Sequence, residues 1–128
     1  MQQQEMKNII EEYIEAYNTF DIDGMLSVMH QDIEVQNISG GKINMSTKGL
    51  PELRQAAEQG KDLFESRCQK VENYRFEDNV CYAKIEYEGV LAADIPNGPK
   101  AEDTLRLKGK STFRFKNGLI VSLVDESS

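Results

Sequence analysis

The sequence feature that most constrains the fold is a long alternating segment, residues 103–116. Its odd-numbered positions from 105 onward carry apolar or small side chains, and its even-numbered positions carry basic side chains or threonine. A period of two is typical of a strand with one buried face. The dipeptide Asn117-Gly118 comes next and favours the positive φ angles of a type I′ turn, so residues 119–124 are expected to fold back antiparallel. The rest of the chain must cover the apolar face of this hairpin.

The first part of the chain predicts the element that supplies this cover. Apolar side chains recur every three or four residues from about Glu5 to Thr19, which is typical of an amphipathic helix. Tyr13 and Tyr17 lie one turn apart on the face that is expected to pack against the sheet. The apolar positions are Met6, Ile9, Ile10, Tyr13, Ile14 and Tyr17.

A short second helix is expected after Asp21-Ile22-Asp23, because either aspartate can accept hydrogen bonds from the free backbone amides at its start. This helix carries Met29 and ends near His30. The only histidine is therefore expected outside any strand.

Further strands and a third helix complete the predicted fold. Asn37 is a polar residue on an otherwise apolar strand face, and Pro51 suits the first turn of a helix whose buried stripe extends to Phe64. Gly109, within the long final strand, is expected to mark a bulge or a bend. Strands are expected at residues 32–38, 42–48, 67–76 and 80–92. This order predicts an α+β fold in which a cone-shaped, curved mixed sheet wraps around the N-terminal helix.

Length and composition restrict the class of protein. A chain of 128 residues is expected to form one domain, residues 1–128. The formal net charge of -7 argues against nucleic-acid binding, because phosphate contacts need basic side chains. No apolar segment approaches the length of a membrane span, and the start of the chain lacks the features of a signal peptide, so a cytoplasmic protein without a membrane partner is expected.

Cysteine and histidine usage gives no support for a cofactor site. Cys68 and Cys81 are expected to remain free thiols, and a single histidine with two distant cysteines supplies no metal-ligand spacing. The sequence contains no glycine-rich phosphate loop and no nucleophile elbow. Neither a metal nor another cofactor is expected.

Five basic side chains form a stripe along the outer face of the segment 103–116. Glu86 and Glu88 share one phase of the preceding strand, so cross-strand ion pairs are the main interpretation of the stripe. An anion site or an acidic partner is the alternative interpretation.

Several segments together resemble a known superfamily. They are Tyr13-Ile14-Glu15, Asp21-Ile22-Asp23 and residues 30–35 near the start, residues 49–53 at the third helix, and residues 113–120 at the final hairpin. These segments resemble the nuclear transport factor two-like superfamily, which includes ketosteroid isomerases and SnoaL-like polyketide cyclases. The resemblance covers nearly the whole chain. It implies a small-molecule pocket in the mouth of the cone and a homodimer formed through the sheet.

The resemblance also implies positions for catalytic residues. The catalytic tyrosine of a ketosteroid isomerase falls on Tyr13, its proton-shuttling aspartate on Asn37, and its second acidic donor on Ser111. An amide cannot accept and return a proton near neutral pH, and a serine hydroxyl is a weaker donor than a buried carboxylic acid. SnoaL-type cyclases place a histidine and an aspartate inside the sheet, whereas His30 is expected outside it. Neither usual mechanism is expected.

Asp125 is the one carboxylate that strand phase places near the pocket, because it alternates with Leu119, Val121 and Leu123. It is the candidate base, and Tyr13 is the candidate donor to a ligand oxygen. The candidate ligand-binding residues are Tyr13, Tyr17, Met29, Asn37, Tyr87, Ser111 and Phe113.

Two functional hypotheses follow from this arrangement. In the first, a SnoaL-like protein binds a small apolar molecule in the cone and acts on a carbonyl compound as an isomerase or a cyclase. In the second, the cone is filled by its own side chains, and a non-catalytic dimeric interaction module uses the outer face of the sheet. Asn37 and Ser111 could equally bond backbone groups or water, because buried polar groups find partners in either case.

Overall fold

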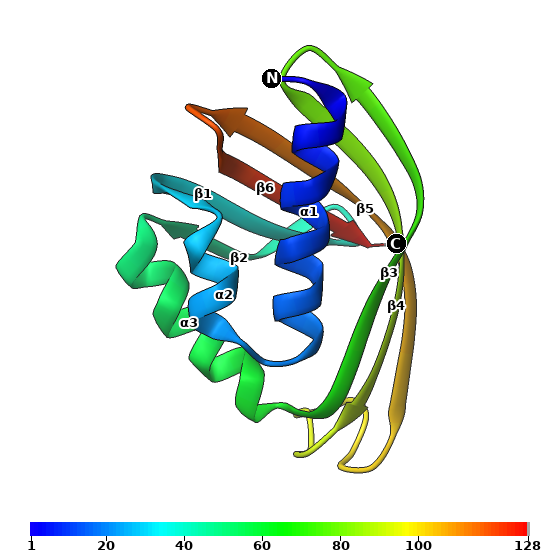
Figure 1. Cartoon of the computed structure of the whole chain (residues 1–128). Coiled ribbons are helices and arrows are strands. Elements are labelled where there is room, and N and C mark those ends of the chain that lie inside the picture. The colour runs from blue at the N-terminus through cyan, green and yellow to red at the C-terminus, as the bar shows by residue number, and fades with distance from the viewer. Residues whose placement is uncertain (128) are drawn as a thin grey trace.

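Helices and strands follow one another through residues 1–127, which are the residues that the computed structural model describes (Figure 1). The elements are α1 (Gln3–Asn18), α2 (Ile22–Ser27), β1 (Met29–Ser39), β2 (Lys42–Lys48), α3 (Leu50–Asp62), β3 (Phe64–Glu77), β4 (Val80–Leu91), β5 (Thr104–Lys116) and β6 (Leu119–Ser127). Every predicted helix and strand occurs, with its ends shifted by up to a few residues.

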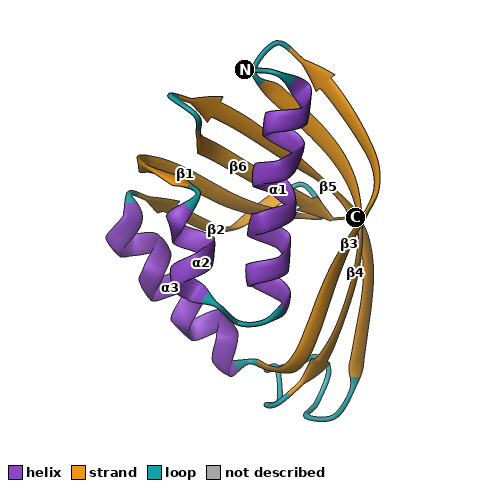
Figure 2. Ribbon diagram, in the orientation of Figure 1, coloured by secondary structure: helices purple, strands orange, loops and turns teal. Residues whose placement is uncertain are grey.

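The six strands form one curved sheet in the order β2-β1-β6-β5-β4-β3. Neighbouring strands are antiparallel except β1 and β6, which run parallel. The sheet bends around α1, and α3 lies against β1 and β2 at one side of the cone (Figures 1 and 2). The predicted α+β cone, with a mixed sheet around an N-terminal helix, is confirmed.

One apolar core joins α1 to the concave face of the sheet. Met6 and Ile10 on α1 are completely buried, together with Phe113 on β5 and Ile120 on β6. Burying a side chain of this size stabilises a fold by about 1.5–3 kcal/mol. The apolar stripe of α1 therefore covers the sheet as predicted.

The turn between β5 and β6 has the predicted geometry. Asn117 has φ 52° and Gly118 has φ 78°, so both positions take the positive angles that a type I′ turn requires. The two strands pair antiparallel on either side of this turn.

The predicted alternation along β6 is wrong at its start. A register shift in the pairing of β5 with β6 turns Ile120 into the core and leaves Leu119 and Val121 only partly buried. The extra residue of a β-bulge changes which side chains point to each face. Regular alternation resumes at Leu123, so Asp125 still lies on the concave face.

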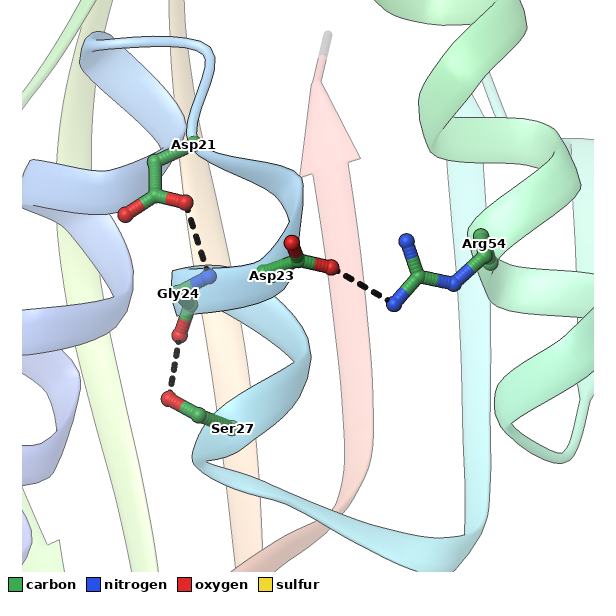
Figure 3. Close-up of polar contacts among 5 residues, drawn as sticks. All are labelled: Asp21, Asp23, Gly24, Ser27 and Arg54. Atoms are coloured by element: carbon green, nitrogen blue, oxygen red, sulfur yellow. Dashed lines mark hydrogen bonds and ion pairs between the residues drawn. The ribbon is translucent and has the colours of Figure 1, made fainter.

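Asp21, not Asp23, caps the start of α2 (Figure 3). Asp21 Oδ1 accepts a hydrogen bond of 3.0 Å from the backbone amide of Gly24. Asp23 Oδ1 instead pairs with Nη2 of Arg54 on α3 at 2.8 Å. At the other end of the helix, Ser27 Oγ donates to the Gly24 carbonyl at 2.7 Å. One aspartate therefore fixes the helix start, and the other ties α2 to α3.

The second helix is shorter than predicted, which changes the placement of two residues. It ends at Ser27, and β1 begins at Met29 and includes His30. The backbone amide of Ile120 on β6 donates to the Val28 carbonyl at 3.0 Å, so pairing with the sheet takes over where the helix was expected to continue. The prediction that His30 lies outside any strand is wrong.

Phe64 differs from its prediction, and Gly109 does not mark the bulge that was one of its two predicted roles. Phe64 starts β3 and pairs with Leu91, because α3 has already ended at Asp62. Gly109 pairs regularly with β4, so it marks no bulge in that ladder. A Cβ atom at position 109 would overlap the Glu126 carbonyl oxygen of β6. Glycine is needed here because β5 and β6 approach closely.

The basic stripe of β5 forms the predicted cross-strand ion pairs. Lys108 Nζ lies 3.7 Å from Glu86 Oε1, and Arg106 Nε lies 3.7 Å from Glu88 Oε2. All four side chains are largely exposed, and pairs of this kind contribute about 0–1 kcal/mol each. The stripe is a solvated outer face of the sheet.

Both cysteines are free thiols, as predicted, with Cys68 exposed and Cys81 buried. None of the helices within residues 1–127 combines the length and the apolar character needed to cross a membrane.

Candidate functional site

Three polar residues lie in a row across the concave face of the sheet. Asn37 of β1 pairs with Asp125 of β6, and Asp125 pairs with Ser111 of β5. Side chains of residues directly opposite each other in neighbouring strands point to the same face. Strand pairing therefore brings together residues that are far apart in the sequence.

The centre of this row is a hydrogen bond between a hydroxyl and a carboxyl group. Ser111 Oγ donates to Asp125 Oδ1 at 2.5 Å. Burial raises the pKa of Asp125 to about 6, and the hydrogen bond from Ser111 partly opposes this rise. A carboxyl group with such a pKa can take up and release a proton near neutral pH.

Tyr13 of α1 supplies a buried phenol near this carboxyl group. Its ring meets the ring of Phe113 edge to face, with 6.1 Å between the centroids. Burial raises the pKa of Tyr13 well above its ordinary value, and the charge of Asp125 raises it further. The phenol therefore stays protonated and can donate a hydrogen bond.

Tyr17 and Tyr87 join α1 to β4 beside Tyr13. Their hydroxyl oxygens are 3.0 Å apart, and the ring of Phe64 packs edge to face on Tyr87 with 5.9 Å between the centroids. Burial raises the pKa of both tyrosines. The contact is thus a hydrogen bond between two neutral hydroxyl groups.

Solvent reaches one end of the concave face. Asn37 is exposed, Tyr87 is partly exposed, and Leu107, which lies opposite Tyr87, is 41% exposed. Polar groups on a concave, mainly apolar surface are the usual composition of a small-molecule site. A ligand could reach the polar row from this end.

Met29 does not lie in this group of residues. It pairs with Ile120 at the start of β1, about 25 Å along the strand from Asn37, and it is buried in the core. The early end of α2 places it there. The predicted site residues that the structure does bring together are Tyr13, Tyr17, Asn37, Tyr87, Ser111, Phe113 and Asp125.

Two hollows lie on the described surface, and Arg67, Tyr87 and Leu107 are among the residues that line the larger one. One has a volume of about 660 Å³ and lies on the outer face of β3, β4 and β5, where Cys68, Glu88 and Arg106 are among its lining residues. The other has a volume of about 470 Å³ and lies between α1 and β3.

Arg67 of β3 is a residue of this site that sequence reasoning missed. It is only 7% exposed, and its Nε donates to the backbone carbonyl of Tyr17 at 2.9 Å. Arginine is usually a surface residue, so its residue type alone does not predict a buried position. The available signal was the phase of β3, in which Arg67 and Gln69 alternate with exposed neighbours.

Comparison with known protein families identifies the family of this chain. Residues 10–123 match the family model of the SnoaL-like domain. The chain belongs to this family. A search of curated proteins found no match to this SnoaL-like domain.

Solved structures share the fold of this SnoaL-like domain. TsrD from Streptomyces laurentii has a TM-score of 0.82 and 16% identity, over 100% of this chain and 91% of that chain. A protein assigned as a SnoaL-like polyketide cyclase from Jannaschia sp. CCS1 has a TM-score of 0.82 and 11% identity, over 98% and 86% of the two chains. An LEH-like epoxide hydrolase from M. tuberculosis has a TM-score of 0.77 and 11% identity, over 98% and 84%. At these identities the similarity is one of fold.

His30 takes no part in the polar row of this SnoaL-like domain. Its Nδ1 accepts a hydrogen bond of 3.0 Å from the backbone amide of Asp32, at the start of β1. Within residues 1–127, no three histidine, cysteine, aspartate or glutamate side chains gather closely enough to hold a metal ion.

Proposed function

We propose that this SnoaL-like domain binds a small, mostly apolar molecule at the open end of the cone and acts on its carbonyl or enol group as an isomerase or a cyclase. The observation that carries this proposal is a buried phenol, Tyr13, near a partly buried carboxyl group of raised pKa, Asp125. Relatives assigned as a polyketide cyclase and named as an epoxide hydrolase support the use of this fold for small-molecule chemistry.

In the proposed reaction, Tyr13 donates a hydrogen bond to the ligand oxygen and stabilises the negative charge of the developing enolate. Asp125 takes a proton from the neighbouring carbon and returns it to another position, for which a pKa of about 6 is suitable. Ser111 holds the carboxyl group through its hydrogen bond. Asn37, at the exposed end of the row, offers its amide to a second polar group of the ligand.

Replacing Tyr13 with phenylalanine tests this proposal. The probe is 2-naphthol, a flat compound whose oxygen can accept a hydrogen bond from a phenol, and its binding is followed by its own fluorescence. We expect Tyr13→Phe to weaken binding by roughly 10-fold, because one such hydrogen bond contributes about 1–1.5 kcal/mol.

Tyr82→Phe is the matched control for this experiment. Tyr82 lies on the outer face of β4, where the guanidinium of Arg75 is 4.2 Å from its ring centroid. This variant should bind 2-naphthol with unchanged affinity. Equal affinities of Tyr13→Phe and the wild-type protein would contradict the proposal.

The outer face of the sheet supports a second candidate function. Its ion pairs between β4 and β5 and the hollow of about 660 Å³ over β3, β4 and β5 form a charged, indented surface. In this proposal the protein is a non-catalytic dimeric interaction module, and that surface makes the contact. Both proposals describe a cytoplasmic homodimer formed through the sheet.

A further inference from the structure

Arg67 is a cation buried on the concave side of β3. It is 7% exposed, whereas its neighbours Ser66 and Cys68 are exposed. Successive side chains of a strand point to opposite faces, so Arg67 points toward α1. There its guanidinium carbon lies 3.7 Å from the centroid of the Tyr17 ring.

The contacts of Arg67 leave part of its guanidinium without a partner. Nε donates to the Tyr17 carbonyl at the end of α1, where the helix dipole favours a positive charge. Nη2 is buried and has no hydrogen-bond partner within residues 1–127. None of the ion pairs formed by these residues includes Arg67.

The surroundings of Arg67 are mainly aromatic. Besides Tyr17, the ring of Phe20 packs on the guanidinium with 4.5 Å to its centroid. Phe20 has φ 59°, a conformation that is unfavourable for a bulky residue. The backbone of this loop is therefore strained at the residue whose ring packs on Arg67. Aromatic faces attract a cation, but they supply neither an acceptor for Nη2 nor a full negative charge.

A protein carboxylate does not fill this role. Asp125, the partly buried carboxyl group of the site, accepts the hydrogen bond of Ser111. A buried charge that has lost water is stable only when it is paired and hydrogen-bonded. If Arg67 only held β3 against α1, this role would explain the hydrogen bond of Nε and the packing of the two rings on the guanidinium. It would not explain why Nη2 is buried without an acceptor.

We propose that Arg67 binds the carboxylate of a flat, ring-containing ligand whose ring lies against Tyr17 and Tyr87. A carboxylate supplies the acceptor for Nη2 and the negative charge that balances the guanidinium. The inference names the substrate class of the site described above, and it rests on the proposed function.

Two matched probes test this inference: 2-naphthoate and its neutral amide, 2-naphthamide. We expect the wild-type protein to bind 2-naphthoate about 10-fold more tightly, which corresponds to about 1.4 kcal/mol, by isothermal titration calorimetry at neutral pH. Arg67→Met should abolish this preference and retain the affinity for 2-naphthamide, because methionine keeps much of the apolar stem of arginine.

Two further variants complete the experiment. Arg75→Met changes an exposed arginine of the same strand and should leave both affinities unchanged. Arg67→Lys keeps the charge without the planar pair of donors, so it should fold and retain a reduced preference of about threefold. If Arg67→Met does not fold, Arg67→Lys takes its place as the test variant.

The outcomes separate this inference from the proposed function. Equal wild-type affinities for the two probes, or an equal loss of both in a folded Arg67 variant, would overturn the carboxylate assignment and leave small-molecule binding intact. If the wild-type protein bound none of 2-naphthol, 2-naphthoate and 2-naphthamide, the proposed function would fail and the inference with it.

Discussion

The burial of Asp125 makes the stability of the fold depend on pH. Its pKa rises from an ordinary value of 3.8 to about 6 in the folded protein, mainly because burial disfavours the charged form. Between these values the folded state holds a proton that the unfolded state has released. The stabilising contribution of the protonated group is therefore fully present below about pH 4 and is lost as the pH rises through 6.

Asp125→Asn should remove this pH-dependent loss, because asparagine keeps the shape and the acceptor for Ser111 but carries no charge. Relative to the wild-type protein, its free energy of unfolding should rise by about 2 kcal/mol between pH 4 and pH 8, since one pKa unit corresponds to about 1.4 kcal/mol and Asp125 retains some solvent contact. Urea denaturation at both pH values measures the difference. Glu65→Gln, at an exposed position of β3, is the control. If the difference in the free energy of unfolding between Asp125→Asn and the wild-type protein were the same at both pH values, burial would not be raising the pKa of Asp125.

Periodicity could place some residues of the site and not others. Tyr13 is part of a clear helical stripe, and Ser111 is part of a clear alternation, so both could be assigned to the concave face from the sequence. Arg67 could not be found by its type, because its burial depends on the rings of Tyr17 and Phe20, which come from a distant segment. A local pattern shows which face of an element a side chain occupies. It does not show which residues from other segments pack against that face.

The pairing of β5 with β6 depends on the absence of a side chain at Gly109. Gly109→Ala would push a methyl group into the Glu126 carbonyl, and a backbone atom cannot move aside as a flexible side chain can. We expect a loss of about 2–3 kcal/mol in the free energy of unfolding, measured by urea denaturation.

Gly60→Ala in α3 is the matched control for this substitution. Apart from its chain neighbours and the backbone of its own helix, no atom lies within 4 Å of a Cβ added there, and alanine is the better helix former, so the same measurement should show a gain of about 1 kcal/mol. If both variants shifted stability in the same direction and by the same amount, close strand approach would not be the reason for Gly109.

Element boundaries depended on contacts that local patterns do not contain. The apolar spacing around Met29 suited a helix, yet the hydrogen bond from Ile120 to Val28 draws this segment into the sheet. Likewise, the bulge that moves Val121 out of phase arises from pairing with β5. The type of each element could be predicted from its own residues, whereas its ends were set by its neighbours.

At the scale of the whole molecule, the outer face of the sheet is the proposed contact surface of the homodimer. Lys108 lies beside Glu86, and Lys110 Nζ lies 3.5 Å from Glu126 Oε2. Replacing both lysines with glutamate would concentrate negative charge on this face, so the mass measured by light scattering should fall from that of two chains to that of one.

The control for the charge reversal is Lys61→Glu, which changes an exposed lysine of α3, away from the outer face of the sheet. Its mass should stay that of the wild-type protein. A dimer that survives the double substitution would exclude this face as the contact surface.

The parallel pairing of β1 with β6 also determines when the site can form. β1 is the first strand of the chain and β6 is the last, yet they are neighbours in the middle of the sheet. Bringing such distant segments together costs more loop entropy than closing a hairpin, so local pairs such as β3 with β4 are favoured earlier in folding. Asn37 and Asp125 become neighbours only through the β1–β6 junction. The polar row therefore does not exist in any partly folded chain that lacks its last strand, and a growing chain can complete this row only when synthesis has delivered β6.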